Sequence, residues 1–303
     1  MAGYDFAAQL DLYGPARRHL RQMSVQESRA YCRRLARSHE ENFTVVNWLL
    51  SRYLQQHFCN LYSYCRWADD LADETGDGVA KGQLLDWWHQ QLVDCYRGRV
   101  NHPVFVALAE TIEEFQLPRQ PFLDLLIAFR QDQTVRRYET FDDLLGYCGN
   151  SANPVGRLVL RLGRCYNDDD KVRLADSVCT GLQLANFCQD VARDYDRGRI
   201  YLPQQSCRRF GYTETMFHLR EYNSQFRQLM IHEVDRAESY LSAGWPLVSC
   251  VGTELRGPVS LFISGGLAIV RAIRRANYNV WARRPTVSPW TKMRLMASAC
   301  WYR

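Results

Sequence analysis

The sequence predicts an all-α fold, and three observations support this prediction. Long stretches carry apolar residues at i, i+3, i+4 and i+7, the spacing that puts them on one face of a helix. The breaks between these stretches are short and contain glycine and proline, and no segment alternates long enough to form a sheet. No Ser/Gly-rich linker divides the 303 residues. We therefore expect a single all-α domain over 1–303, with residues 1–27 as an N-terminal extension.

In chain order, the amphipathic stretches predict helices over 27–43, 46–73, 83–98 and 121–133. Each is rich in helix-forming residues and carries apolar side chains at helical spacing. Glycine and proline predict the breaks, which lie at 75–83, 97–103, 116–121, 148–154 and 196–206. The apolar stretch 257–270 is shorter than the about 20 residues that a membrane span needs, so we expect a buried helix or an interfacial patch there.

The composition favours a cytoplasmic protein without nucleic-acid partners. The hydrophobic fraction of 47% is enough for a sizeable core, and the start MAGYDFAAQLDLYG lacks the basic and apolar regions of a signal peptide. The 11 cysteines are scattered and form no CxxC pair, so we expect reduced thiols. A net charge of +5 without a recognition motif argues against nucleic-acid binding, whereas an anionic membrane surface or a diphosphate remains compatible.

Two acidic segments give the strongest indication of function. In YSYCRWADDLAD (62–73), Asp69 and Asp73 are four residues apart and share a helix face, whereas Asp70 lies about a hundred degrees round. The segment 183–194 repeats the spacing in one stripe of side-chain oxygens: Gln183, Asn186, Asp190 and Asp194. The residues between them are largely apolar, so each stripe is expected to face an enclosed space.

The most direct explanation of these stripes is a divalent cation. A single acidic pair on a helix is usually a solvated surface, but two such stripes set among apolar residues would be costly without a counter-charge. Mg²⁺ takes oxygen ligands and typically uses one or two carboxylates together with waters and substrate phosphates. The pattern therefore predicts a diphosphate held between the two stripes by several magnesium ions.

The chain resembles the squalene/phytoene synthase family, the head-to-head prenyl synthases with an all-α isoprenoid synthase fold, from about residue 28 to 300. Residues 62–73 match the family motif YxxxRxxDDxxD, and 183–203 match QxxNxxxDxxxD followed by RxYLP. SHEENFTV (38–45) and SANPVG (151–156) are most similar to the hydroxysqualene synthase branch of the family.

The resemblance implies a role for each matching residue. It implies that magnesium is held by Asp69, Asp73, Asn186, Asp190 and Asp194. It implies that Tyr62 and Tyr201 take part in catalysis with the four aspartates. The residues implied to bind substrate are Asn42, Phe43, Arg66, Tyr147, Gln183, Asn186, Arg199 and Arg284. Arginine suits this role because its guanidinium group can bind two phosphate oxygens at once.

The reaction implied is the conversion of presqualene diphosphate and water to hydroxysqualene and diphosphate, a step in making squalene for hopanoids, with Mg²⁺ and without NADPH. One alternative within the family is the condensation of two prenyl diphosphates, such as farnesyl diphosphate, to presqualene diphosphate, squalene or phytoene. A non-enzymatic alternative is an inactive relative that serves as a lipid-binding or assembly scaffold. Peripheral contact with the inner face of the membrane is compatible with a lipid product, and the sequence leaves the oligomeric state open.

The sequence also departs from the family pattern in places. Gln189 stands where several relatives have arginine, and Val270 stands where squalene and phytoene synthases often have tyrosine. The loss of that hydroxyl weakens a squalene or phytoene assignment. GDGVAKG (76–82) has the wrong glycine spacing for a nucleotide-binding loop, so we interpret it as a flexible flap beside the first motif.

Overall fold

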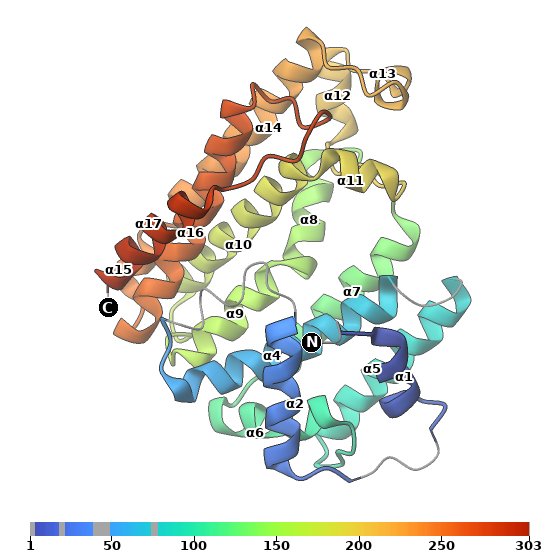
Figure 1. The fold of residues 1–303 in the computed structure, drawn as a ribbon, viewed down its shortest axis with the longest axis vertical. Coiled ribbons are helices and arrows are strands. Elements are labelled where there is room, and N and C mark those ends of the chain that lie inside the picture. Colours follow the sequence, from blue (N-terminus) through green and yellow to red (C-terminus); the bar gives the residue numbers. More distant parts are fainter. Residues whose placement is uncertain (1–3, 18–21, 39–48, 74–77, 303) are drawn as a thin grey trace. The chain divides into compact units, whose positions relative to one another are not determined.

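The computed structural model describes residues 4–17, 22–38, 49–73 and 78–302, and these residues confirm the predicted all-α fold (Figure 1). Within them there is no strand, and the isolated bridge between Arg137 and Ile200 is the β-type pairing present. The chain forms two compact units, residues 1–133 and 134–303. Whether they constitute the single domain expected from the sequence stays a prediction.

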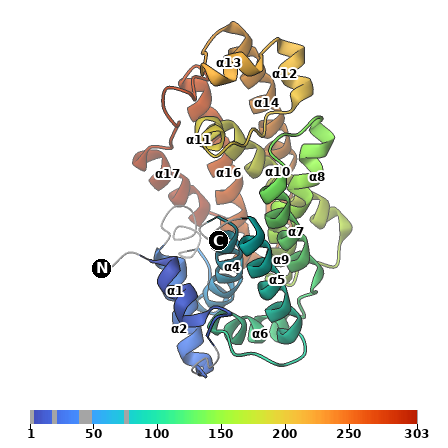
Figure 2. The ribbon, with the colours of Figure 1, turned by 90° about the vertical axis from the view of Figure 1, so that its right-hand side faces the viewer.

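The first unit consists of six described helices: α1 (Phe6–Tyr13), α2 (Val25–Ser38), α4 (Arg52–Asp73), α5 (Gly78–Cys95), α6 (Pro103–Phe115) and α7 (Gln120–Thr134). Helix α4 packs against α2, α5 and α6, so it is the central helix of this unit (Figure 2). Residues of the predicted N-terminal extension join this core, because Phe6 packs edge-on against Trp67 with ring centroids 5.2 Å apart.

Buried aromatic rings surround a buried histidine in this core. Trp67 and Trp88 stack with ring centroids 5.3 Å apart, and the His102 imidazole meets both edge-on at 4.6 and 5.0 Å. His102 also caps α6, where its Nδ1 accepts a hydrogen bond from the amide of Val104. Burial lowers the pKa of His102 to about 3, so the ring is neutral at physiological pH. Trp88 is therefore part of the buried core of this unit.

The second unit contains the remaining helices: α8 (Phe141–Ser151), α9 (Asn153–Leu162), α10 (Asp169–Gln189), α11 (Val191–Asp196), α12 (Gln204–Phe210), α13 (Glu214–His218), α14 (Ser224–Ala243), α15 (Leu247–Cys250), α16 (Thr253–Arg275) and α17 (Pro289–Cys300). Helices α10, α14 and α16 pack against one another (Figures 1 and 2). Gly181 permits the close approach of α10 to α14, because a Cβ atom there would lie 2.7 Å from the amide nitrogen of Leu241.

Local signals in the sequence explain several helix boundaries. Asp168 caps α10 by accepting a hydrogen bond from the amide of Asp170. Thr140 and Asp143 form a reciprocal capping box at the start of α8. These caps fix where each helix begins and therefore the orientation of the side chains that follow.

Other predicted boundaries are wrong. The helix expected over 46–73 begins only at Arg52, with Leu49–Ser51 outside it. The break expected at 148–154 shrinks to Ala152, because proline is tolerated in the first turn of α9. The flap expected at 76–82 is helical from residue 78 onward, as the start of α5, and its first two residues lie outside the described ranges. The end of the helix expected over 27–43 also lies outside them.

Helix α16 contains the apolar stretch 257–270 and is the one described helix long and apolar enough to cross a membrane. Its window is 61% buried within the protein, as in the core helix of a globular unit. The structure therefore supports the buried-helix interpretation of this stretch.

Candidate active site

The first acidic stripe lies at the C-terminal end of α4. Asp69 and Asp73 are one helical turn apart, as the spacing predicts; the side chain of Asp69 is 44% exposed and Asp73 is also exposed. Tyr62 lies half-buried on the same helix, where burial raises its pKa to about 12. The phenol therefore keeps its proton at neutral pH.

Asp70 faces a different environment from Asp69, and Arg66 contacts both. The Asp70 side chain is fully buried, forms an ion pair with Arg66 and accepts a hydrogen bond of 3.2 Å from the Tyr4 hydroxyl. Arg66 also donates to Asp69 Oδ2 at 3.1 Å. Burial opposes the charge on Arg66, but Asp70 and Asp69 outweigh it and raise the pKa of the guanidinium. The aspartate pair therefore anchors Arg66 at the base of the stripe.

The second stripe runs along α10 and α11. Gln183 and Asn186 lie half-buried on α10, Asp190 is the single residue between the two helices, and Asp194 lies on α11. The backbone hydrogen bonds continue through the break, because Asp190 N donates to Asn186 O and Asp194 N donates to Asp190 O, both at 2.9 Å. The four-residue spacing predicted from the sequence is therefore kept despite the interruption.

Arg284 forms a bidentate ion pair with Asp190 across 94 residues of sequence. Its Nε and Nη2 atoms donate to the two Asp190 carboxylate oxygens at 2.5 and 2.8 Å. The same Nη2 donates to Gln189 Oε1 at 3.0 Å, and the buried Gln189 amide donates to the carbonyl oxygen of Pro285 at 2.6 Å. Gln189 thus fixes both the Arg284 side chain and the adjoining backbone.

An aromatic cluster lies beside this stripe and contains Tyr138, Tyr147, Phe187 and Tyr201. The Phe187 and Tyr201 rings stack with centroids 4.0 Å apart, and Tyr147 lies 5.7 Å from Tyr201 and 6.1 Å from Phe187. Tyr147 and Tyr201 are both buried, so the structure brings these two predicted residues together. Their rings provide an apolar surface with electron-rich faces.

A tight turn places Tyr201 in this cluster. Gly198 adopts φ 73°, which glycine tolerates, and the Arg199 amide donates to the Asp194 carbonyl at 2.8 Å. The chain then lies along residues 136–139, where the Ile200 amide donates to the Arg136 carbonyl at 2.9 Å. Arg199 itself is half-buried beside this turn.

The predicted residues therefore fall into two groups, one in each unit. Tyr62, Arg66, Asp69 and Asp73 lie together on α4, and the remaining described residues gather around α10 and α11 in the second unit. Asn42 and Phe43 lie outside the described residues. Sequence reasoning missed Tyr4 as a partner of Asp70 and Gln189 as a partner of Arg284. The i,i+4 spacing of Arg66 and Asp70 could have revealed that pair, whereas nothing local connects Gln189 with Arg284.

The donor atoms of each stripe fit magnesium. In the second stripe all the donors are carboxylate or amide oxygens (Asn186, Asp190 and Asp194), and such hard ligands suit Mg²⁺. Among the described residues, no three His, Cys, Asp or Glu side chains cluster as a metal site. A magnesium ion that also binds phosphate oxygens and waters needs only one or two carboxylates, so paired aspartates are a suitable donor set.

Comparisons with known proteins identify the family to which the chain belongs. The squalene/phytoene synthase family model matches residues 36–291. The 15-cis-phytoene synthase of Synechocystis sp. is 31% identical over 291 residues, which cover 92% of this chain and 86% of that protein. The hydroxysqualene synthase of Rhodopseudomonas palustris is 37% identical over 168 residues, 54% of this chain and 56% of that protein.

A solved structure shows the same fold. The crystal structure of squalene synthase HpnC from Alicyclobacillus acidocaldarius matches with a TM-score of 0.80 and 42% identity, covering 84% of this chain and 96% of that one. Together with the all-α fold, these matches show a synthase that processes prenyl diphosphates. The chain belongs to the squalene/phytoene synthase family.

Proposed function

We propose that the protein is a magnesium-dependent hydroxysqualene synthase, which converts presqualene diphosphate and water to hydroxysqualene and diphosphate. The observation that carries this proposal is the match to the hydroxysqualene synthase of Rhodopseudomonas palustris, at 37% identity over 54% of the chain. The similarity to the squalene synthase HpnC structure, at 42% identity over 84% of the chain, supports a squalene-type product. Val270, fully buried in α16, provides no hydroxyl where squalene and phytoene synthases often have tyrosine.

In this proposal the acidic stripe of each unit holds magnesium for diphosphate. Magnesium held by Asp69, Asp73, Asn186, Asp190 and Asp194 would neutralise the charge of the departing diphosphate. Arg66 and Arg284 are poised to donate to phosphate oxygens, because each already presents its guanidinium at an aspartate of a stripe. Gln183 and Arg199 complete the proposed substrate contacts at the second stripe.

In this proposal the aromatic cluster acts on the hydrocarbon part of the substrate. Loss of diphosphate leaves a carbocation, which the faces of Tyr147, Tyr201 and Phe187 would stabilise by about 0.5–2 kcal/mol each. The same buried rings exclude bulk water, so that a single admitted water captures the rearranged cation. NADPH has no part in this reaction, because water rather than hydride ends it.

Phytoene synthesis is the second candidate. Its support is the 31% identity to a 15-cis-phytoene synthase over 92% of this chain, a longer match than that to the hydroxysqualene synthase. Both candidates use the same stripes, and they differ in the length of the prenyl chain and in how the cation is quenched. The scaffold hypothesis has less support, because all four aspartates are present.

The test is to incubate the protein separately with presqualene diphosphate, farnesyl diphosphate and a twenty-carbon prenyl diphosphate, with Mg²⁺ and without NADPH, and to identify the products by mass spectrometry. Hydroxysqualene formed from presqualene diphosphate alone is the expected result. A forty-carbon product would contradict the proposal in favour of phytoene synthesis, and the absence of any product would favour the scaffold.

A cytoplasmic location with peripheral contact to the inner face of the membrane completes the proposal, since the product is a thirty-carbon lipid that must reach a bilayer. Release of active protein from membranes by high salt would support it, because salt screens the attraction of basic surfaces to anionic lipids. Activity that remains with the membrane until detergent is added would contradict it.

A further inference from the structure

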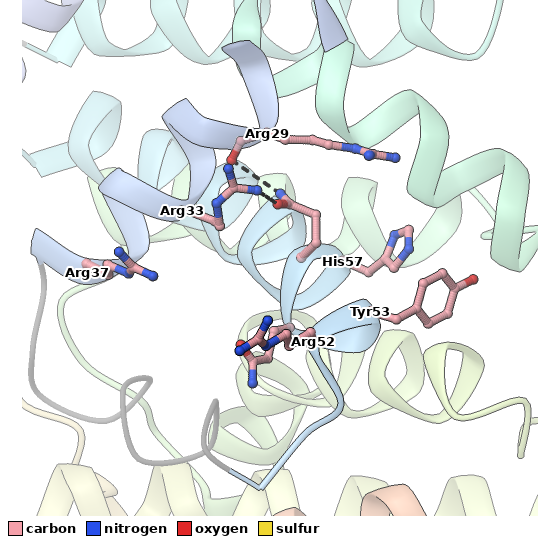
Figure 3. A pocket seen from close by; sticks show the side chains of 8 residues that line it. Arg29, Arg33, Arg37, Arg52, Tyr53 and His57 are labelled. Atoms are coloured by element: carbon pink, nitrogen blue, oxygen red, sulfur yellow. Dashed lines mark hydrogen bonds between the residues drawn. The ribbon is translucent and has the colours of Figure 1, made fainter. Parts of the chain in front are cut away.

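A basic pocket lies in the first unit, between α2 and the start of α4 (Figure 3). It has a volume of about 550 Å³. Its described lining residues are Arg29, Arg33, Arg37, Arg52, Tyr53, Gln55, Gln56 and His57. None of these is a carboxylate, and none belongs to the acidic stripe of this unit, so the pocket is a separate feature.

The arginines of α2 are placed in one stripe. Arg29, Arg33 and Arg37 follow one another at four-residue intervals, and Arg52 adds a fourth cation from the first residue of α4 (Figure 3). Like charges at this spacing repel and cost a helix about 0.2–0.5 kcal/mol per pair. Such an arrangement is favourable when an anion binds among the guanidinium groups.

The hydrogen-bond partners of Arg29 and Arg33 leave the pocket positively charged. Glu110 of α6 neutralises Arg29 through two bonds of 2.7 and 2.9 Å at one end of the pocket. Arg33 instead donates to the side-chain oxygen of Gln56, which carries no charge. Burial lowers the pKa of His57 and the positive charge of Arg29 lowers it further, so this residue adds a neutral ring.

A buried hydrogen-bond network orders the floor beneath Arg33. The Gln56 amide donates to Asn60 Oδ1 at 2.8 Å, and the Asn60 amide donates to Thr111 Oγ1 at 3.0 Å and to the carbonyl oxygen of Ala107 at 2.9 Å. Thr111 Oγ1 also lies 3.0 Å from His57 Nδ1. Because Asn60 and Thr111 are fully buried, this network directs the Gln56 oxygen at Arg33 and holds that guanidinium at the pocket.

We propose that this pocket binds a phosphate group, with Arg33, Arg37 and Arg52 as its cationic ligands. Arginine forks match the geometry of phosphate oxygens, and the ordered floor reduces the entropy lost when Arg33 binds. The phosphate is carried either by a soluble diphosphate or by the headgroup of an anionic phospholipid. Binding here requires no metal, which separates it from the function proposed for the acidic stripes.

The test uses the double variant R33Q/R52Q in the full chain. Sodium diphosphate is titrated calorimetrically in EDTA at low ionic strength, so that magnesium-dependent binding at the aspartates does not contribute. In a parallel arm, co-sedimentation compares vesicles of phosphatidylglycerol and phosphatidylcholine with vesicles of phosphatidylcholine alone. The control R173Q/R208Q removes the same charge from exposed arginines in the second unit that pair with Asp170 and Glu139.

Binding is expected to weaken at least about tenfold in R33Q/R52Q, which is equivalent to about 1.4 kcal/mol. In the control variant the affinity is expected to stay near the wild-type value. Loss confined to the diphosphate arm assigns a soluble ligand, and loss confined to the anionic vesicles assigns a lipid headgroup. Both results support the phosphate site. Equal weakening in variant and control, or no binding of the wild type in either arm, would overturn it.

Discussion

The two acidic stripes share the same four-residue spacing of side chains. The arginine that pairs with each stripe, however, comes from a different place in the chain. On α4, Arg66 lies within four residues of Asp69 and Asp70, so one helix supplies both charges. At the junction of α10 and α11, Asp190 is paired with Arg284, which is 94 residues away in sequence. The first pair is a property of one helix, whereas the second depends on the tertiary fold of its unit.

Because of this difference, we expect the two ion pairs to respond differently to substitution. Asp70 is fully buried and its partner Arg66 is 24% exposed, and breaking such a pair costs far more than breaking an exposed one. Asp190 is partly exposed, at 20%, and its arginine is positioned by Gln189. We therefore expect substitutions at the first pair to act mainly on stability and substitutions at the second pair to act mainly on substrate binding.

The largest stability effect is expected for Asp70→Asn, at about 3–5 kcal/mol of unfolding free energy, because Arg66 loses the one of its two aspartate partners that is fully buried. Asp69→Asn is the matched control. Its side chain is 44% exposed, and exposed pairs contribute at most about 1 kcal/mol. Urea denaturation of both variants measures the difference, and equal losses would contradict the distinction between the two aspartates.

The next effect concerns turnover. Asp190→Asn is expected to lower activity by at least about 100-fold, because it removes a proposed magnesium ligand together with the partner of Arg284. Its circular dichroism spectrum should match that of the wild type, since the residue is partly exposed. Activity within a few-fold of the wild-type value would refute the metal assignment at the second stripe.

The pH dependence of the unfolding free energy tests the buried His102 in the core of the first unit. The pKa of His102 falls from 6.5 to about 3 on folding, so between these values the unfolded chain binds a proton that the folded chain does not. Stability is therefore lost as the pH falls through this window, at up to about 1.4 kcal/mol per pH unit. The variant His102→Asn keeps a capping side chain but cannot titrate. A slope unchanged by this substitution would contradict the neutral buried imidazole.

The smallest effect is expected for Gln189→Ala, which removes the hydrogen bond from Arg284 and the bond to Pro285. Unfolding free energy should fall by about 1–3 kcal/mol, because buried hydrogen-bonding groups lose their partner. The Michaelis constant should rise more than the turnover number falls if Gln189 positions Arg284 for substrate. Gln205→Ala, a half-buried glutamine in α12, is the control.

The sequence predicted the all-α fold and the spacing within each stripe, because both follow from local helical periodicity. It placed the start of the second helix too early, since Leu49–Ser51 are apolar or small yet lie outside α4. The pair between Asp190 and Arg284 was not predicted, although both residues were singled out, because a contact across 94 residues leaves no local pattern. The burial of Asp70 was likewise hidden, since Tyr4 comes from a segment interpreted as an extension.

The central claim is that the two aspartate stripes bind magnesium together with diphosphate, and calorimetry tests it most directly. The magnesium-dependent part of diphosphate binding is measured for the wild type, Asp69→Asn and Asp190→Asn. Each substitution is expected to weaken this binding at least about tenfold. Binding by either variant that equals the wild-type value would contradict the claim.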